Sequence, residues 1–238
     1  MSTIFAELLH QTLAPEVSQP VAPQATWTGW AWDPDQFRDE QVRNLVRQVF
    51  LPGWPRPARQ VVFCGVGEGD VTEICLSVAH TLAAQVCGNV CVVDANPHVT
   101  SMHESEAGEK AVSDYRRCGL LRELSQQIAG NLWRVPKDLF TRGSGQRLSA
   151  EWLPGRMREL SLEFDYSIIN GPAAVISGEG ALLGHLSDVI ILVLRANSTR
   201  RIAAQNIRQM LRSANATLLG VVLDQRRFPI PKGIYNKL

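Results

Sequence analysis

The chain has 238 residues, of which 45% are hydrophobic and 20% are charged, and its formal net charge is +1. These values are typical of a folded globular domain, and they exclude a broad basic surface for nucleic acid or anionic membranes. No apolar run approaches the roughly 18 residues of a membrane span, and the five cysteines form no CxxC pair, which suits a reducing compartment. We therefore expect a cytoplasmic protein without a membrane span and without a nucleic-acid partner.

Residues 1–34 differ in composition from the rest of the chain. Residues 1–13 predict a short amphipathic helix, and residues 14–34 form a linker rich in proline and tryptophan. An apolar helix on a flexible tether is typical of a docking peptide, but it could equally fold back on its own domain. The clustered tryptophans indicate either a cap over the edge of the domain or an interface. The candidate partner contacts in this region are Ile4, Leu8, Leu9, Trp27, Trp30 and Trp32.

Residues 35–97 predict two helices and two strands. The first helix spans residues 35–50, and its apolar stripe includes Leu45 and Val49. A short apolar strand around Val62 then runs into a glycine-rich turn, which opens a helix whose buried face repeats every four residues from Ile74 to Val86. The next strand ends at Asp94. A strand that enters a helix through a glycine-rich turn has the geometry of a phosphate-binding loop.

The side chains that such a loop needs are missing. A working loop of the form GxxxxGK[ST] uses a lysine on the phosphates and a hydroxyl on Mg²⁺. If Gly69 is the last glycine, Asp70 takes the lysine position, Val71 takes the hydroxyl position and Cys64 takes the first position. Exchanging a cation for an anion about 4 Å from a phosphate changes the pair energy by roughly 8 kcal/mol at an effective dielectric near 20.

The second half of the chain predicts alternating helices and strands. The strands are expected at Leu132–Val135, Tyr166–Asn170, around Ile190 and around Leu219, and a helix is expected at residues 151–164. This order indicates a doubly wound, mostly parallel sheet with helices on both faces, formed by residues 35–238 as one α/β domain. The last predicted helix carries a basic face, which is either solvated or a surface for an anionic partner: Arg195, Arg200, Arg201, Arg208 and Arg212.

Three segments resemble one known family. VGEGDVT, VCVVDANPHVTSMH and FDYSIINGPAAV are similar to motifs of the bacterial tyrosine kinases, or BY-kinases, which are MinD/ParA-like P-loop proteins of capsule and exopolysaccharide export. The resemblance implies a P-loop NTPase fold that binds ATP and Mg²⁺. Asp94 is retained, whereas Asn96 and Asn170 replace two aspartates of the family's site. The remnants of the nucleotide pocket are Gly67, Gly69, Asp70, Val71, Thr72, Asp94, Asn96 and Asn170.

Two further family features are incomplete. The family's ExxRxxR helix serves ring-like self-association; here Glu40 and Arg43 match, Val46 takes the third position, and the arginine follows one residue later at Arg47. Autophosphorylating members carry a C-terminal tyrosine cluster, whereas this tail has Tyr235 alone. Self-association therefore stays an open expectation, with Glu40, Arg43 and Arg47 as its candidate residues.

The altered side chains predict a catalytically inactive, BY-kinase-like pseudo-ATPase without catalytic residues, metal site or cofactor. It would act as a cytoplasmic scaffold or regulator of exopolysaccharide synthesis or secretion, bound to a protein partner such as an inner-membrane secretion component. The alternative is a divergent ATP- and Mg²⁺-binding tyrosine kinase or ATPase that uses a substitute cation, for instance Arg195. A nucleic-acid-binding partitioning relative is disfavoured by the net charge.

Overall fold

The computed structural model describes residues 34–51, 57–67, 70–96, 120–140, 148, 150–174 and 178–225. The predicted N-terminal helix, residues 14–33 of the proline- and tryptophan-rich linker, the six candidate contacts of these two segments, Gly69 and Tyr235 lie outside these residues. No helix within the described ranges is both long and apolar enough to cross a bilayer.

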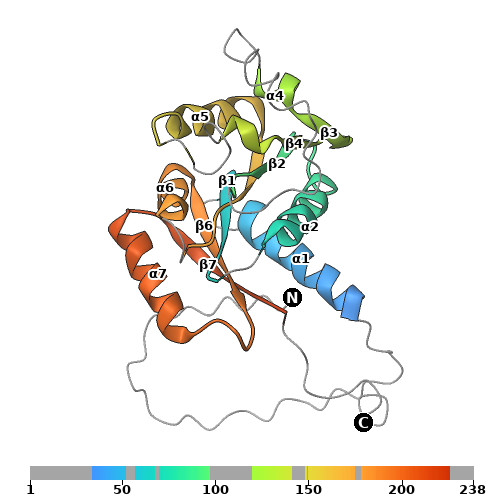
Figure 1. Cartoon of the computed structure of the whole chain (residues 1–238). Coiled ribbons are helices and arrows are strands. Elements are labelled where there is room, and N and C mark those ends of the chain that lie inside the picture. Colours follow the sequence, from blue (N-terminus) through green and yellow to red (C-terminus); the bar gives the residue numbers. More distant parts are fainter. Residues whose placement is uncertain are drawn as a thin grey trace, which may run out of the picture.

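A single seven-stranded sheet forms the centre of the described fold (Figure 1). Its strand order is β3-β4-β2-β5-β1-β6-β7, and every neighbouring pair is parallel except β3 with β4. The predicted doubly wound, mostly parallel sheet is therefore confirmed. The strands are β1 (Gln60–Gly65), β2 (Val90–Asp94), β3 (Gln126–Ala129), β4 (Leu132–Val135), β5 (Tyr166–Asn170), β6 (Val189–Arg195) and β7 (Leu218–Asp224).

Helices cover both faces of the sheet because alternate strand residues point to opposite sides. One core cluster joins the first two helices to strand residues such as Val61 and Phe63, and the other joins the later helices to Val62 and Cys64. The helices are α1 (Pro34–Phe50), α2 (Thr72–Ala83), α4 (Leu121–Leu124), the 3-10 turn η1 (Lys137–Leu139), α5 (Leu153–Glu163), α6 (Glu179–Leu186) and α7 (Arg201–Ser213).

Three elements differ from the sequence prediction. Helix α2 ends at Ala83, so Val86 is a half-buried residue beyond the helix and was wrongly assigned to it. Strand β3 was not predicted, since all four of its residues are exposed and show no alternation. Helix α6 was also missed, because it is short and apolar on most sides.

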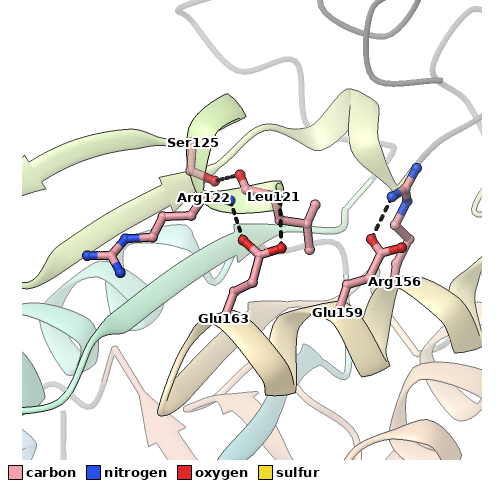
Figure 2. A network of polar contacts seen from close by, with 6 residues as sticks. All are labelled: Leu121, Arg122, Ser125, Arg156, Glu159 and Glu163. Carbon is pink, nitrogen blue, oxygen red and sulfur yellow. Dashed lines mark hydrogen bonds and ion pairs between the residues drawn. The ribbon is translucent and has the colours of Figure 1, made fainter. Parts of the chain in front are cut away.

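The short helix α4 is held in place by α5 (Figure 2). The Glu163 carboxylate accepts hydrogen bonds from the backbone N–H groups of Leu121, at 2.9 Å, and Arg122, at 2.6 Å. The Ser125 hydroxyl donates to the Leu121 carbonyl at 2.7 Å. An anion at a helix N-terminus satisfies N–H groups that have no partner within the helix. Glu163 therefore joins a local turn to the main body of the domain.

Candidate functional site

The candidate site lies at the carboxyl ends of three neighbouring strands. Strand β5 lies between β2 and β1, and Asp94 at the end of β2 is the register partner of Asn170 at the end of β5. Helix α2 begins at Thr72, shortly after β1. Parallel strands place their carboxyl ends at one edge of the sheet, where α/β proteins bind ligands. Residues far apart in the sequence, Thr72, Asp94 and Asn170, thus come together.

Asp70 occupies the N-terminus of α2 with its own carboxylate. Its Oδ1 atom accepts hydrogen bonds from the backbone N–H of Thr72, at 2.9 Å, and from the Thr72 hydroxyl. Helix N-termini attract anions because their N–H groups are free and the helix dipole is positive there. In a phosphate-binding loop this place receives the ligand's phosphate. In this chain it receives a carboxylate of the protein.

Asn170 connects Thr72 to Asp94 through the two hydrogens of its amide nitrogen. Nδ2 donates to Thr72 Oγ1 at 2.9 Å and to Asp94 Oδ1 at 3.2 Å. The backbone N–H of Asn96 also donates to Asp94 Oδ1, at 3.2 Å. Asn170 and Asn96 are buried, with 1% and 4% of their surfaces exposed. A continuous hydrogen-bonded chain therefore runs from Asp70 through Thr72 and Asn170 to Asp94.

The chain of hydrogen bonds depends on asparagine at position 170. An ionised aspartate only accepts hydrogen bonds, so it could donate neither to Thr72 nor to Asp94 and would add a third carboxylate to Asp70 and Asp94. The amide does leave its Oδ1 atom buried without a hydrogen-bond partner in the described part of the chain. An unsatisfied buried acceptor costs about 1–3 kcal/mol. The two donated bonds are thus kept despite that cost.

Two of the residues in the former loop are packed rather than reactive. Val71, at the hydroxyl position, is 3% exposed and belongs to the core on the α1/α2 side. The Cys64 thiol is fully buried, and burial raises its pKa from 9.0 to about 12. A thiol with this pKa is protonated at neutral pH and is a poor nucleophile or metal ligand. Among the described residues no group of three histidine, cysteine or acidic side chains is arranged to hold a metal.

A cavity of about 270 Å³ opens beside this network, between the loop after β1 and the ends of β6 and β7. The sequence analysis names Arg195 of this lining as a substitute cation. It does not identify Ser198, Thr199 or Asp224, because no motif marks them. The cavity contains charged groups of both signs. Its lining residues are Gly65, Val66, Gly67, Asp70, Val71, Val193, Arg195, Ser198, Thr199, Arg200, Ala203 and Asp224.

The candidate self-association residues lie together on α1. Arg43 forms an ion pair with Glu40 of the same helix at 2.8 Å, and Arg47 is exposed one turn later. Val46 is fully buried in the core, so this position faces the interior of the domain. The structure thus accounts for the shift of the arginine by one residue, since a charge at position 46 would be buried without a partner.

The described fold is similar to that of several solved structures. The chimeric protein CapA2B2 shares 14% sequence identity at a TM-score of 0.62, over 79% of this chain and 85% of that one. The kinase domain of the Escherichia coli tyrosine kinase ETK shares 19% identity at a TM-score of 0.57, over 81% of this chain and 79% of that one. A ParA family ATPase from Chlorobium tepidum shares 16% identity at a TM-score of 0.56, over 76% and 78%.

These similarities confirm the expected fold: the chain has the α/β, P-loop NTPase type of architecture found in bacterial tyrosine kinase domains and ParA-like ATPases. No protein-family model matches the chain, and no curated protein sequence does either.

Proposed function

We propose that this chain is a BY-kinase-like protein that has lost ATP binding and catalysis. It acts as a cytoplasmic scaffold or regulator of exopolysaccharide synthesis or secretion, through a protein partner such as an inner-membrane secretion component. The fold supports the relation to bacterial tyrosine kinase domains. The pathway and the partner are inferred from the sequence resemblance, because a shared fold does not by itself transfer a function.

The observation that carries the proposal is the hydrogen-bonded chain from Asp70 to Asp94. Asp70 already supplies the anion at the N-terminus of α2, where a phosphate would bind. The hydrogens of Asn170 are both donated within the protein, to Thr72 and to Asp94. A phosphate entering the crevice would meet a carboxylate and no free donor from this chain of residues.

The residues present do not fit a magnesium nucleotide. In nucleotide sites Mg²⁺ is held by hydroxyl and carboxylate oxygens, and the metal and a lysine together neutralise the phosphates. Here the Thr72 hydroxyl and the Asp94 carboxylate are engaged with Asp70 and Asn170. Position 70 adds a negative charge where the phosphates need a positive one. We therefore assign neither ATP nor Mg²⁺ to this crevice.

The second candidate is a divergent ATP-binding kinase or ATPase with a substitute cation. Arg195 and Arg200 line the same cavity as Gly67 and Asp70, which brings two guanidinium-bearing residues to the side of the former loop. If they held phosphates, the nucleotide would have to lie displaced toward β6 and α7. This candidate predicts Mg²⁺-dependent nucleotide binding that Arg195→Ala weakens.

Isothermal titration of the full chain with ATP and ADP, with and without Mg²⁺, separates the two candidates. We expect no measurable binding up to about 1 mM nucleotide, where the binding free energy would be only about −4 kcal/mol. Micromolar, Mg²⁺-dependent binding that is lost in Arg195→Ala would contradict the proposal and establish the second candidate.

Restoring the charges tests the cause of the loss. The triple variant Asp70→Lys, Val71→Thr, Asn170→Asp should bind ATP with Mg²⁺ at a Kd below about 1 mM, because it replaces the internal anion by a cation. The matched control is Asp70→Asn, which keeps an acceptor oxygen for Thr72 but supplies no cation, and which should not bind. A folded triple variant that still fails to bind would show that charge alone did not close the crevice.

A further inference from the structure

One segment of the chain carries basic residues without acidic ones. The sequence from Val189 to Leu223 contains five arginines and no aspartate, glutamate or lysine. The whole chain has 24 basic and 23 acidic residues, so the remainder of the chain is net negative. This segment forms β6, α7 and β7 at one end of the sheet. Within this segment no acidic residue offsets the arginines, and the next acidic residue is Asp224 at the end of β7.

Helix α7 presents part of this charge on a single face. Ile207 and Leu211 are buried in the core, so the opposite face of the helix points outward at the periphery of the molecule (Figure 1). Residues four and eleven positions apart lie on one line along a helix. The outward face, here called the α7 patch, consists of the exposed residues Arg201, Ile202, Gln205, Gln209 and Arg212.

The α7 patch combines unpaired charge with an exposed apolar side chain. Within the described ranges of the chain, neither Arg201 nor Arg212 has an ion-pair partner. Ile202 leaves 70% of its surface exposed, beside the line of the two arginines. Eleven residues at 1.5 Å each place Arg201 and Arg212 about 16 Å apart along the helix axis. Ile202 thus lies at the Arg201 end of this span, and arginine and buried apolar area are both enriched in the cores of protein interfaces.

We propose that the α7 patch docks an acidic segment of a protein partner, which presents carboxylates about three helical turns apart and an apolar side chain next to one of them. Charge complementarity selects an acidic partner. Ile202 favours a protein over a nucleic acid, which offers no apolar side chain to it. The apolar face of α7 is buried in the core, so the helix has no apolar face to insert into a bilayer. The proposal concerns a surface outside the crevice and holds whether or not the crevice binds nucleotide.

Fluorescence anisotropy with a labelled helical peptide tests this assignment. The probe contains alanine, glutamates three turns apart and one leucine next to one of the glutamates. The variant Arg201→Gln/Arg212→Gln should bind it at least about tenfold more weakly than the native chain, and salt should weaken native binding. The matched control, Arg59→Gln/Arg158→Gln, removes the same charge from exposed arginines elsewhere and should bind like the native chain.

The apolar contact is tested by a double-mutant cycle. Ile202→Ser and the replacement of the peptide's leucine by serine should each weaken binding, and together they should weaken it by less than the product of the single effects. Leu162→Ser, at a residue of α5 that is 76% exposed, should change nothing. The proposal is overturned if the native chain does not bind the probe, or if both arginine variants bind alike. Independent effects of Ile202→Ser and of the leucine replacement in the peptide would also overturn it. The same holds if the native chain binds duplex DNA or phosphatidylglycerol vesicles more tightly than it binds the peptide.

Discussion

The Cys64 thiol fills the space that a side chain at position 171 would need. A Cβ atom built on Gly171 would lie 2.6 Å from Cys64 Sγ and 3.0 Å from Val62 Cγ1. Cys64 also lies against Gly180, where an added Cβ would be 3.4 Å from the sulfur. Cys64, at the first position of the former loop, and Gly171, directly after β5, are therefore matched in size. The altered residues Asp70 and Asn170 are likewise matched, since each forms a hydrogen bond with the Thr72 hydroxyl.

The size match predicts coupling between positions 64 and 171. Gly171→Ala should lower the free energy of unfolding by about 1–3 kcal/mol, because an overpacked core must displace its neighbours. Adding Cys64→Ala should recover most of this loss, and the residual contact with Val62 accounts for the rest. Urea unfolding of the single and double variants measures the cycle.

Gly155→Ala on α5 is the control, since nothing lies within 4 Å of an added Cβ there and alanine favours a helix. This variant should be as stable as the native chain or slightly more stable. Strictly additive effects of Gly171→Ala and Cys64→Ala would contradict the size match.

At the scale of elements, α4 joins α5 to β4 at the edge of the sheet. Helix α4 has four residues, too few to be stable by itself. Besides the two hydrogen bonds to Glu163 (Figure 2), the Arg122 guanidinium lies over the Trp133 ring of β4, 4.7 Å from its centroid. On α5 itself, Arg156 and Glu159 form an ion pair at 2.6 Å. One carboxylate thus connects a peripheral turn to the core helix.

Glu163→Ala should destabilise the domain by about 1–2 kcal/mol, because two N–H groups of α4 lose their acceptor. Hydrogen exchange should show the loss of protection first at the Leu121 and Arg122 amides. Glu123→Ala removes the same charge from an exposed residue of α4 and should leave both amides protected. Equal exchange rates in the two variants would exclude the capping role of Glu163.

At the scale of the whole molecule, the two core clusters enclose three thiols. Cys64 and Cys91 lie in the cluster on the α5–α7 side of the sheet, and Cys75 lies in the cluster on the α1/α2 side. Burial raises the pKa of Cys91 from 9.0 to about 12, as it does for Cys64, and burial also raises the pKa of Cys75. Cys87 is exposed. The interior therefore holds these thiols in their neutral form.

This burial predicts a loss of stability at alkaline pH. Above pH 9.0 the unfolded chain releases the thiol protons, whereas the folded chain retains those of Cys64 and Cys91 until about pH 12. The unfolded state then binds fewer protons, so stability falls by about 1.4 kcal/mol per pH unit for each thiol within that window. Urea unfolding at about pH 8 and pH 10 measures the slope. The slope should be smaller in Cys64→Ala/Cys91→Ala and unchanged in Cys87→Ala; equal slopes in all three proteins would contradict the prediction.

The local pattern of the sequence determined most of the elements. Apolar spacing predicted α2, α5 and α7, since a helix with one buried face repeats apolar residues along that face. Short continuous apolar runs predicted β1, β2, β5 and β6, whose residues are mostly buried on both sides of the sheet. The same reading identified the anion at position 70 and the amide at position 170. It missed β3 and α6, whose residues carry no such one-sided pattern.

Only the tertiary structure decided how the altered residues interact. Asn170 reaches Thr72 and Asp94 across 98 and 76 residues of sequence because β5 lies between β1 and β2. The contact of Cys64 with Gly171 and the cavity beside the loop arise in the same way, from segments that the sheet brings together. Hydrogen bonds and packing act over a few ångströms in space. Their partners are set by the order of strands in the sheet, which the spacing of residues along the chain does not encode.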